Sequence, residues 1–331
     1  MRLIAEFEEQ GFTQIVFPHK ETDWKIYLDE AQESFKNIIN TIATFQPCLV
    51  ITDDINETKK FFENIKNIFF IEYCCDDTWA RDTSVLCRKN EGSIDLLDFR
   101  FTAWGGKYNA SKDDKMNQSL KKHYDKDMLS IDFILEGGGI ESNGKNLLIS
   151  TKNCMLNQNR NSTLKESEIT KEIESLFLKQ KLLYLEHGYL SGDDTDSHID
   201  TLVRFISEDT LMYVKCNDVA DEHYAELSAM EAELFIIAKE YHLRLIPLPM
   251  TEAIYYEDER LPATYANFLF VNGGVIVPTY GVKEDKEALE IFRKSFKDRK
   301  IIGVDSSVLI RQHGSLHCIS MNFAKGVSFD L

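Results

Sequence analysis

The sequence predicts one closed α/β domain over residues 1–331, with internal pseudo-fivefold symmetry. A short apolar strand, a polar loop, a hairpin and a helix recur in that order about five times, at intervals of roughly 55 to 70 residues. No low-complexity linker divides the chain, and its six prolines are scattered. Hydrophobic residues make up 43% of the chain, which is ample for a core at this length.

Local periodicity and turn chemistry place the individual elements. Amphipathic patterns predict helices at 24–45, 57–65, 113–126, 164–177, 220–242 and 284–296. Apolar runs predict buried strands at 14–17, 48–52, 68–73, 133–135, 182–185 and 243–248. Paired runs predict hairpins at 84–99, 140–150, 198–215 and 268–277. The second hairpin carries Asn143-Gly144, the strongest short hairpin signal, and a final unit runs from 301 to 323.

Composition narrows the class of partner. The formal net charge of -17 argues against nucleic acid and anionic membranes, and it is compatible with a cationic substrate. No apolar run approaches the roughly 20 residues that span a bilayer, and the N-terminus turns acidic too early for a secretory signal. Seven cysteines without CxxC spacing indicate free thiols in a reducing compartment. We therefore expect a cytoplasmic protein, and the sequence leaves a homo-oligomer open.

Cys318 is the candidate nucleophile, because it lies near the start of a strand-like run that follows the loop Gln312-His313-Gly314. A thiol attacks only as the thiolate, so it needs nearby positive charge or a base. In a strand, His317 would point to the opposite face from Cys318, which leaves His198 as the candidate base. The alternative is that Cys318 simply packs as a small hydrophobe.

Polar loops at equivalent places in the repeated units would converge if the units surround an axis. They would then bring together Arg81, Asp82, Glu136, His198, Asp200, Asn267 and Cys318. In a strand, His198-Ile199-Asp200 would put an imidazole and a carboxylate on one face. Two aspartates beside a thiol suit a planar, cationic, donor-rich group, and guanidinium is such a group.

Simpler interpretations of the same residues remain open. His198 and Asp200 could form a surface or capping pair, Glu136 could merely close a turn, and Asp82 could be a turn residue. No second histidine cluster completes a zinc set, so we expect neither a metal nor a cofactor.

Seven segments, in order along nearly the whole chain, resemble the agmatine deiminases and the bacterial-type peptidylarginine deiminases. They are FPHKETDW at 17–24, WARDT at 79–83, AWGGKY at 103–108, LEGG at 135–138, DTDSHID at 194–200, YANF at 265–268 and LHCI at 316–319. The matches depart from the family pattern at Ser197, where glycine is usual, and at Leu316, where isoleucine is usual. A larger departure is Arg311-Gln312-His313-Gly314-Ser315, where the family usually has a run of glycines.

The resemblance implies the pentein fold, a five-bladed α/β propeller with pseudo-fivefold symmetry. It also implies Cys318 as nucleophile, His198 as acid and base, and Glu136 as the partner of His198. Asp82 and Asp200 would bind the guanidinium. The same motifs supply Arg81, Trp79, Trp104 and Asn267 as further substrate-binding residues.

The implied activity is hydrolysis of agmatine, a small cationic guanidino substrate, to N-carbamoylputrescine and ammonia through a cysteine thiouronium intermediate. Deimination of peptidyl or free arginine is the alternative within this class. Gln312 and His313 affect which substrate we expect, because they replace glycines that form a pocket wall in the family. A non-catalytic pentein binding protein would lack the thiol, imidazole and acids that this chain retains. A cysteine peptidase would not require two additional aspartates.

Overall fold

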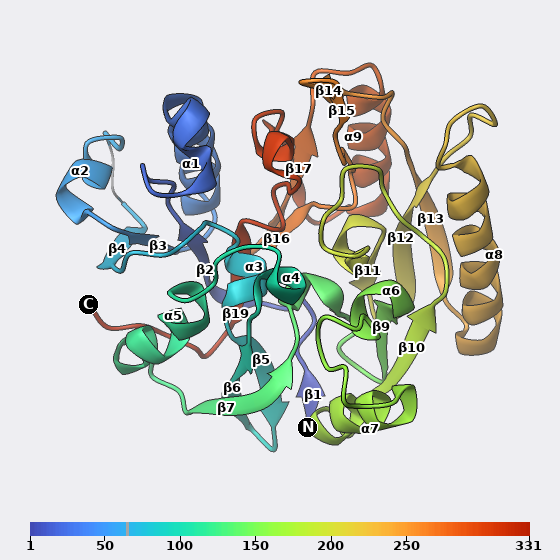
Figure 1. Ribbon diagram of the computed structural model, residues 1–331, viewed down its shortest axis with the longest axis horizontal. Helices are drawn as coiled ribbons and strands as arrows, with labels where there is room; N and C mark the ends of the chain where they lie inside the picture. The colour runs from blue at the N-terminus through green and yellow to red at the C-terminus, as the bar shows by residue number, and fades with distance from the viewer. Residues whose placement is uncertain (64–65) are drawn as a thin grey trace.

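A computed structural model describes residues 1–63 and 66–331, which form a mixed α/β protein. Helices lie around a group of small sheets, and neither chain end is remote from them (Figure 1). This part of the chain contains five sheets of three or four strands and a separate pair, β14 (Tyr255–Tyr256) with β15 (Glu259–Arg260). None of its helices is both long and apolar enough to span a bilayer.

The five larger sheets share one strand pattern, in which an antiparallel pair is extended by a parallel neighbour. The first sheet has the order β1 (Arg2–Leu3), β5 (Leu86–Asn90), β6 (Ser93–Arg100), β7 (Met128–Ile134). The next three are β8 (Glu141–Ser142), β9 (Leu147–Thr151), β10 (Lys181–Leu185); β11 (Val203–Ser207), β12 (Thr210–Lys215), β13 (Arg244–Pro249); and β16 (Leu269–Val271), β17 (Gly274–Thr279), β18 (Lys300–Asp305). The fifth is β19 (Ser320–Ala324), β2 (Gln10–Val16), β3 (Cys48–Thr52), β4 (Ile68–Glu72).

A helix separates the two members of a parallel pair in every one of these sheets, because a parallel connection needs a crossover. These helices are α1 (Leu28–Ala43), α5 (Asp113–Leu120), α7 (Glu166–Leu176), α8 (Tyr224–Tyr241) and α9 (Glu284–Ser295), with α2 (Ile55–Lys59) between β3 and β4. The recurrence of hairpin and helix predicted from the sequence is therefore present. The strands form separate sheets, however, and none of these sheets closes on itself in residues 1–63 and 66–331.

Single helical turns occupy the loops between these elements. They are α3 (Ala80–Thr83), α4 (Ala103–Gly106), α6 (Lys152–Met155) and the 3-10 turns η1 (Asp23–Tyr27), η2 (Lys121–His123), η3 (Gly137–Gly139), η4 (Ile199–Thr201) and η5 (Leu309–Gln312). Such loops carry most of the predicted site residues, so the sheets act as the frame that holds them.

The first and last parts of the chain meet in one sheet. Strand β19 pairs antiparallel with β2, with Ser320 opposite Ile15. The rings of Phe12 and Phe323 stack across this pair at 4.2 Å between centroids, and both are buried. This pairing fixes the turn that carries Cys318 against the N-terminal sheet.

Two sequence predictions near the site are wrong in detail. Residues 198–200 are not strand: His198 precedes η4, and β11 begins only at Val203. Cys318 also lies in a turn, two residues before β19 begins. The helix predicted at 57–65 corresponds to α2, but residues 64–65 lie outside the described part of the chain.

Candidate active site

A pocket opens between the loops at one side of the sheets, with Cys318 in its wall. Its lining comes from five separate segments: Asp23, Asp77, Trp79, Asp82, Trp104, Tyr108, Asp194, Thr195, Gln312, His313, Gly314 and Cys318. Four of the predicted site residues are therefore at the pocket, and Glu136, His198, Asp200 and Asn267 are buried beside them. The predicted convergence of polar loops is present.

Gly138 is the point at which these loops approach most closely. A Cβ atom built there would lie 2.6 Å from His198 Nδ1, 2.9 Å from Asp82 Oδ1 and 3.1 Å from Asp200 Oδ2. Its backbone N–H donates to Asp82 Oδ1 over 2.9 Å. The glycines after Glu136 therefore do more than close a turn, because only a residue without a side chain fits among these three groups.

Asn267 holds the turn of Cys318. Its Oδ1 accepts hydrogen bonds from the backbone N–H groups of His317 (2.8 Å) and Cys318 (3.3 Å), and its Nδ2 lies 3.2 Å from Cys318 Sγ. Burial raises the pKa of the Cys318 thiol well above its usual value, and the charges of Asp200 and Asp82 raise it further. Both effects favour the protonated thiol, and a positive charge placed beside it would favour the thiolate.

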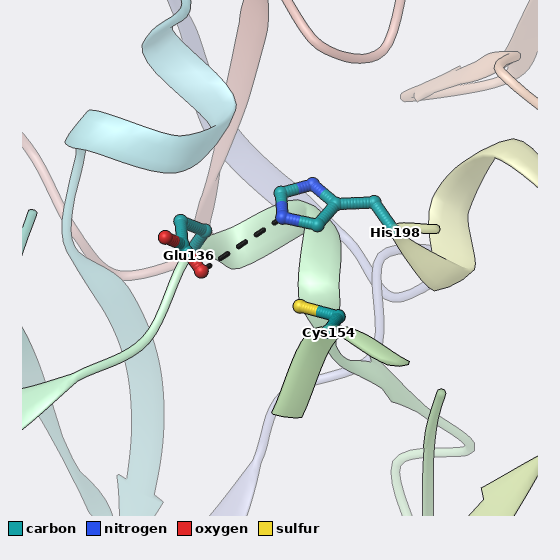
Figure 2. Close-up of side chains that lie close together, drawn as sticks. All are labelled: Glu136, Cys154 and His198. Atoms are coloured by element: carbon teal, nitrogen blue, oxygen red, sulfur yellow. Dashed lines mark ion pairs between the residues drawn. The ribbon is translucent and has the colours of Figure 1, made fainter. Parts of the chain in front are cut away.

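His198 is buried between two carboxylates. Its Nδ1 lies 3.6 Å from Asp82 Oδ1 and its Nε2 lies 3.8 Å from Glu136 Oε2 (Figure 2). Burial opposes the charged imidazole, but Asp82, Cys154 and Glu136 outweigh it, so the pKa of His198 is raised well above its usual value. An imidazolium in this place can give a proton to a leaving group.

Glu136 keeps its charge although it is buried. Burial raises the pKa of this carboxyl, but His198 and Arg160 more than reverse the effect and lower it below its usual value. Arg160 Nε donates to both carboxylate oxygens, over 3.0 and 2.8 Å, and its terminal nitrogens donate to Asp196 Oδ2 and to the Thr195 carbonyl. Arg160 was not anticipated from the sequence, and it ties Glu136 to the loop that carries His198.

Asp82 and Asp200 are the two carboxylates beside the thiol. Asp82 Oδ2 accepts from Trp104 Nε1 over 3.0 Å, so its side chain bonds across the site rather than capping its own turn. Burial raises the pKa of Asp82. Asp200 Oδ2 lies 2.7 Å from His317 Nδ1 and 3.7 Å from Cys318 Sγ.

One oxygen of Asp200 has no partner. Among the described residues no donor reaches its Oδ1, although the residue is only 1% exposed. Burial opposes ionisation of Asp200, but His317, His198 and Arg204 lower its pKa below the usual value. A charged, unpaired acceptor next to a thiol is a place where a donor-rich cation would bind.

The remaining predicted residues divide into two groups. Trp79 and Trp104 line the pocket, and a Cβ at Gly314 would lie 2.2 Å from the Trp79 ring, so that ring rests on the glycine. Arg81 does not line the pocket, contrary to the expectation from its motif. Its guanidinium turns to the opposite side, where it donates to Glu6 Oε1 and Asn322 Oδ1.

A buried network behind the site was missed. His317 Nε2 lies 2.8 Å from Glu6 Oε1, so this imidazole bridges Glu6 and Asp200. Arg204 donates to Glu6 and Glu141, and also to two backbone carbonyls. Burial raises the pKa of Glu6, but Arg81, His317 and Arg204 outweigh burial and lower it. The position of His317 next to Cys318 was the available signal, but the assumption of a strand directed its side chain elsewhere.

Gln312 and His313, which stand where glycines were expected, form part of the pocket wall. Gln312 Nε2 donates to the Asp23 carbonyl over 3.0 Å, and His313 Nδ1 lies 2.7 Å from the Gly192 carbonyl. His313 has a positive φ of 65°, which explains why glycine is also compatible with this position. These two side chains join three loops around the mouth of the pocket.

The mouth is acidic. Asp23, Asp77 and Asp194 lie there, and the lining residues include no lysine or arginine. Burial and the nearby charges of Asp23 and Asp113 raise the pKa of Asp77 to about 8. Asp77 is therefore largely protonated at neutral pH, so the preference of this end of the pocket for a positively charged group over a carboxylate rests on Asp23 and Asp194, with Asp77 adding to it as the pH rises.

Cys154 is a further neighbour of the site that sequence reasoning missed. Its Sγ, Glu136 and His198 Nε2 form a compact group of the kind that can hold a metal ion, although no such set was expected from the sequence (Figure 2). Cys154 belongs to none of the motifs used above, and α6 brings it to the site.

The chain has close relatives of known structure. A model of the Porphyromonas-type peptidyl-arginine deiminase family matches residues 2–323. A cysteine-to-serine variant of the agmatine deiminase of C. jejuni, solved with substrate bound, is 38% identical with a TM-score of 0.94, covering 98% of this chain and 96% of that one. The agmatine deiminase of Enterococcus faecalis is 26% identical with a TM-score of 0.89, covering 98% and 96%. The agmatine deiminase of Pseudomonas aeruginosa is 28% identical, covering 96% of this chain and 94% of the relative.

Proposed function

This chain belongs to the Porphyromonas-type peptidyl-arginine deiminase family, and from that premise we propose that it is an agmatine deiminase. It would hydrolyse agmatine to N-carbamoylputrescine and ammonia. The observation that carries the proposal is the pair Asp82 and Asp200 beside the Cys318 thiol, in a pocket whose lining has no lysine or arginine.

Guanidinium binding is the first step. Asp82 and the free Oδ1 of Asp200 would accept hydrogen bonds from the guanidinium nitrogens. The bound cation would offset the two negative charges that raise the pKa of Cys318, and so favour the thiolate. Substrate binding and activation of the nucleophile are then one event.

Chemistry follows from the positions of the thiol and the imidazole. The thiolate attacks the guanidinium carbon, and the His198 imidazolium gives its proton to the leaving nitrogen, so ammonia departs and a thiouronium remains on Cys318. Because Nδ1 of His198 faces Asp82, the nitrogen that Asp82 holds is within reach of that proton. The neutral imidazole then takes a proton from water, and the resulting hydroxide attacks the same carbon. The C–S bond breaks while the proton of the new hydroxyl passes to the sulfur, which releases the ureido product and restores the Cys318 thiol and the His198 imidazolium.

The pocket mouth favours agmatine over arginine. Agmatine carries an ammonium at its far end, which would face Asp23, Asp77 and Asp194. Free arginine would bring a carboxylate to the same three acids, with no lysine or arginine in the lining to pair with it. The substrate carboxylate and the charged acids of the mouth would repel each other, and Asp77 would add to the repulsion as it ionises near pH 8, so free arginine is the poorer substrate.

We also propose that the five sheets are the blades of a pentein-type propeller. Two features support this: the strand pattern repeats in each sheet, and the last strand, β19, completes the sheet of β2.

Ammonia release from agmatine, arginine and an arginyl peptide, measured in parallel, tests the function. We expect turnover of agmatine with kcat/KM at least about a hundredfold above that of arginine, equivalent to roughly 2.7 kcal/mol. Cys318→Ser is the matched control for contaminating activity. Faster turnover of arginine or of the peptide would overturn the substrate assignment, and no turnover of any of the three would overturn the deiminase assignment.

A further inference from the structure

We infer that Glu136, Cys154 and His198 form a binding site for a borderline divalent transition metal such as Zn²⁺, and that metal bound there switches off turnover. The first part stands on the geometry alone, and the second rests on the proposed deiminase function. The three side chains offer one oxygen, one sulfur and one nitrogen, all buried and all within 4.8 Å of one another. Zn²⁺ and Co²⁺ accept this mixed set, whereas Ca²⁺ and Mg²⁺ prefer oxygen alone.

The Nε2 nitrogen of His198 makes no hydrogen bond within the described residues and only a long ion pair with Glu136. His198 Nε2 is buried, and none of the described residues gives it a hydrogen bond. It lies 3.8 Å from Glu136 Oε2, which is too long for a hydrogen bond. Two ligands at about 2.0 to 2.2 Å from one tetrahedral zinc lie roughly 3.3 to 3.6 Å apart, so a small movement of either side chain would bring both onto one ion. Figure 2 shows the Cys154 thiol on this same side of the ring.

Gly139 lies against the sulfur and the imidazole of this group. A Cβ at this glycine would lie 3.1 Å from Cys154 Sγ and 3.8 Å from His198 Nε2, so a side chain there would crowd both ligands. A water molecule would be the fourth ligand of a tetrahedral ion on this side. The positive charge of Arg160 opposes binding of a cation here. Its Nε nevertheless uses only one lone pair of each Glu136 oxygen, so the carboxylate can still coordinate a metal ion.

A metal ion bound to these three side chains would block the His198 imidazole but leave the substrate pocket open. The metal would bind Nε2, whereas Nδ1 faces Asp82 and the substrate side. Binding would displace the thiol proton of Cys154 and one proton of the His198 imidazolium, and both protons pass to solvent. A ring with metal on Nε2 and a proton on Nδ1 has no free nitrogen to accept a proton from water. Agmatine would still bind, so kcat should fall while KM stays unchanged.

Cobalt binding tests the site without reference to activity. The full chain carrying Cys318→Ser is titrated with Co²⁺, so that the nucleophile cannot supply the sulfur. We expect thiolate-to-cobalt charge-transfer absorption that saturates at one equivalent. It should vanish when Cys154→Ser is added and persist when Cys216→Ser, a substitution of another buried cysteine, is added instead. Absorption that survives Cys154→Ser would overturn the site.

A second variant guards against a folding defect in Cys154→Ser. Gly139→Ala keeps all three ligands and places a methyl group against two of them, so it should weaken Co²⁺ binding at least about tenfold. Unchanged Co²⁺ affinity in Gly139→Ala would contradict the proposed geometry.

Zinc inhibition of the wild-type chain tests the consequence. Micromolar Zn²⁺ should lower kcat for agmatine with KM unchanged, and Cys154→Ser should raise the inhibitory concentration at least about a hundredfold. Equal inhibition of both proteins, or inhibition that competes with agmatine, would overturn the inhibitory role. If the wild-type chain does not turn over agmatine, the deiminase proposal fails, and the cobalt result still decides the metal site.

Discussion

Asp200 separates two regions of opposite character. On one side lies the pocket, where Asp200 Oδ1 has no hydrogen-bond partner among the described residues and where the pKa of Cys318 is raised. On the other side lies the buried network, where Asp200 Oδ2 meets His317 and both oxygens of Glu6 are occupied. Both regions concentrate charge away from water, but in the network both oxygens of Glu6 are paired, and among the atoms of Arg81, Arg204 and His317 only Arg81 Nε lacks a hydrogen bond within the described residues.

The difference separates stability from function. A buried charge without partners is costly, and a fold retains it where a ligand supplies the missing partner. The network pairs its acids with Arg81, Arg204 and His317, so those side chains are fixed before any substrate arrives. The pocket leaves its charges open, which prepares it for a cation. Substitutions on the two sides should therefore have different signatures.

The largest effect is expected from Cys318→Ser on the pocket side. The variant should fold normally and lose nearly all turnover, because an alcohol of much higher pKa cannot replace the thiolate. Turnover and thermal unfolding of the same preparation provide the measurement. An amidine with a haloalkyl leaving group should also label Cys318 selectively among the seven cysteines. Labelling at Cys74 or Cys216, with activity lost in step, would refute the assignment.

Asp82→Asn and Asp200→Asn should each lower kcat/KM for agmatine at least about a hundredfold, or roughly 2.7 kcal/mol. An asparagine keeps the size but removes the charge and turns a donor toward the donors of the substrate. Because these contacts also align the carbon with Cys318, kcat should fall as well as kcat/KM.

The control for this prediction is the melting temperature of the Asp82→Asn protein. A residue that only shaped its turn would lose thermal stability and keep near-normal kinetics. That outcome would defeat the guanidinium-binding role, and it would place Asp82 with the network rather than with the pocket.

The sequence predicted the pocket side far better than the network. Asp82, His198 and Cys318 stand in short motifs, so their types and order were visible without any structure. Their local geometry was not: η4 and the turn before β19 replace the strands that were assumed, because tertiary contacts such as those of Asn267 hold these segments. An argument from periodicity uses only residues that are neighbours in the chain, so it cannot include such tertiary contacts.

The network was invisible because its contacts are long-range. Glu6 and His317 are 311 positions apart, and no local pattern relates them. Arg81 is a second case in which the sequence could not indicate the contacts of a side chain. It shares a motif with Asp82, yet its guanidinium points to Glu6 and not into the pocket. Motif membership indicated which residues matter, and only the packing of the sheets decided on which side each one acts.

A smaller effect is expected at His317, which joins the two regions. His317→Asn keeps a donor near the position of Nδ1, toward Asp200, whereas His317→Gln reaches toward Glu6. Each variant removes one hydrogen bond from a carboxylate, which costs about 1 to 3 kcal/mol of stability. Glu6 keeps Arg81 and Arg204 as donors, whereas Asp200 keeps only longer contacts, of 3.3 Å from Asn267 and 3.7 Å from Cys318 Sγ. Only His317→Gln should therefore also lower kcat/KM, by about tenfold, because Asp200 then loses the donor that orients it.

Melting temperatures and steady-state kinetics of the two variants decide this point. Equal kinetic losses in both would mean that His317 supports the fold alone. Equal stability with unequal kinetics would mean that the Glu6 contact contributes nothing measurable.

The smallest effect is expected at Asp77, at the mouth of the pocket. Its pKa of about 8 means that it ionises as the pH rises from 6.5 to 9, while agmatine remains cationic. Affinity for agmatine should therefore increase over this range, by up to about tenfold for an interaction of roughly 1.4 kcal/mol. The dissociation constant is best measured by calorimetry on Cys318→Ser, which removes titration of the nucleophile. Asp77→Asn in the same background should show a flat profile.

Stability gives an independent check with a fixed sign. The folded-state pKa of Asp77 lies above the value of about 3.9 for an unfolded chain, so between these two values the unfolded chain binds fewer protons than the folded one. The contribution of Asp77 to stability therefore declines as the pH rises from about 4 to 8, and Asp77→Asn should remove that decline. An affinity profile that stays pH-dependent in Asp77→Asn would assign the titration to another group at the mouth. A profile that is flat already in the Cys318→Ser parent would mean that Asp77 does not sense the substrate ammonium, and the mouth would then behave as the paired network does rather than as the open pocket.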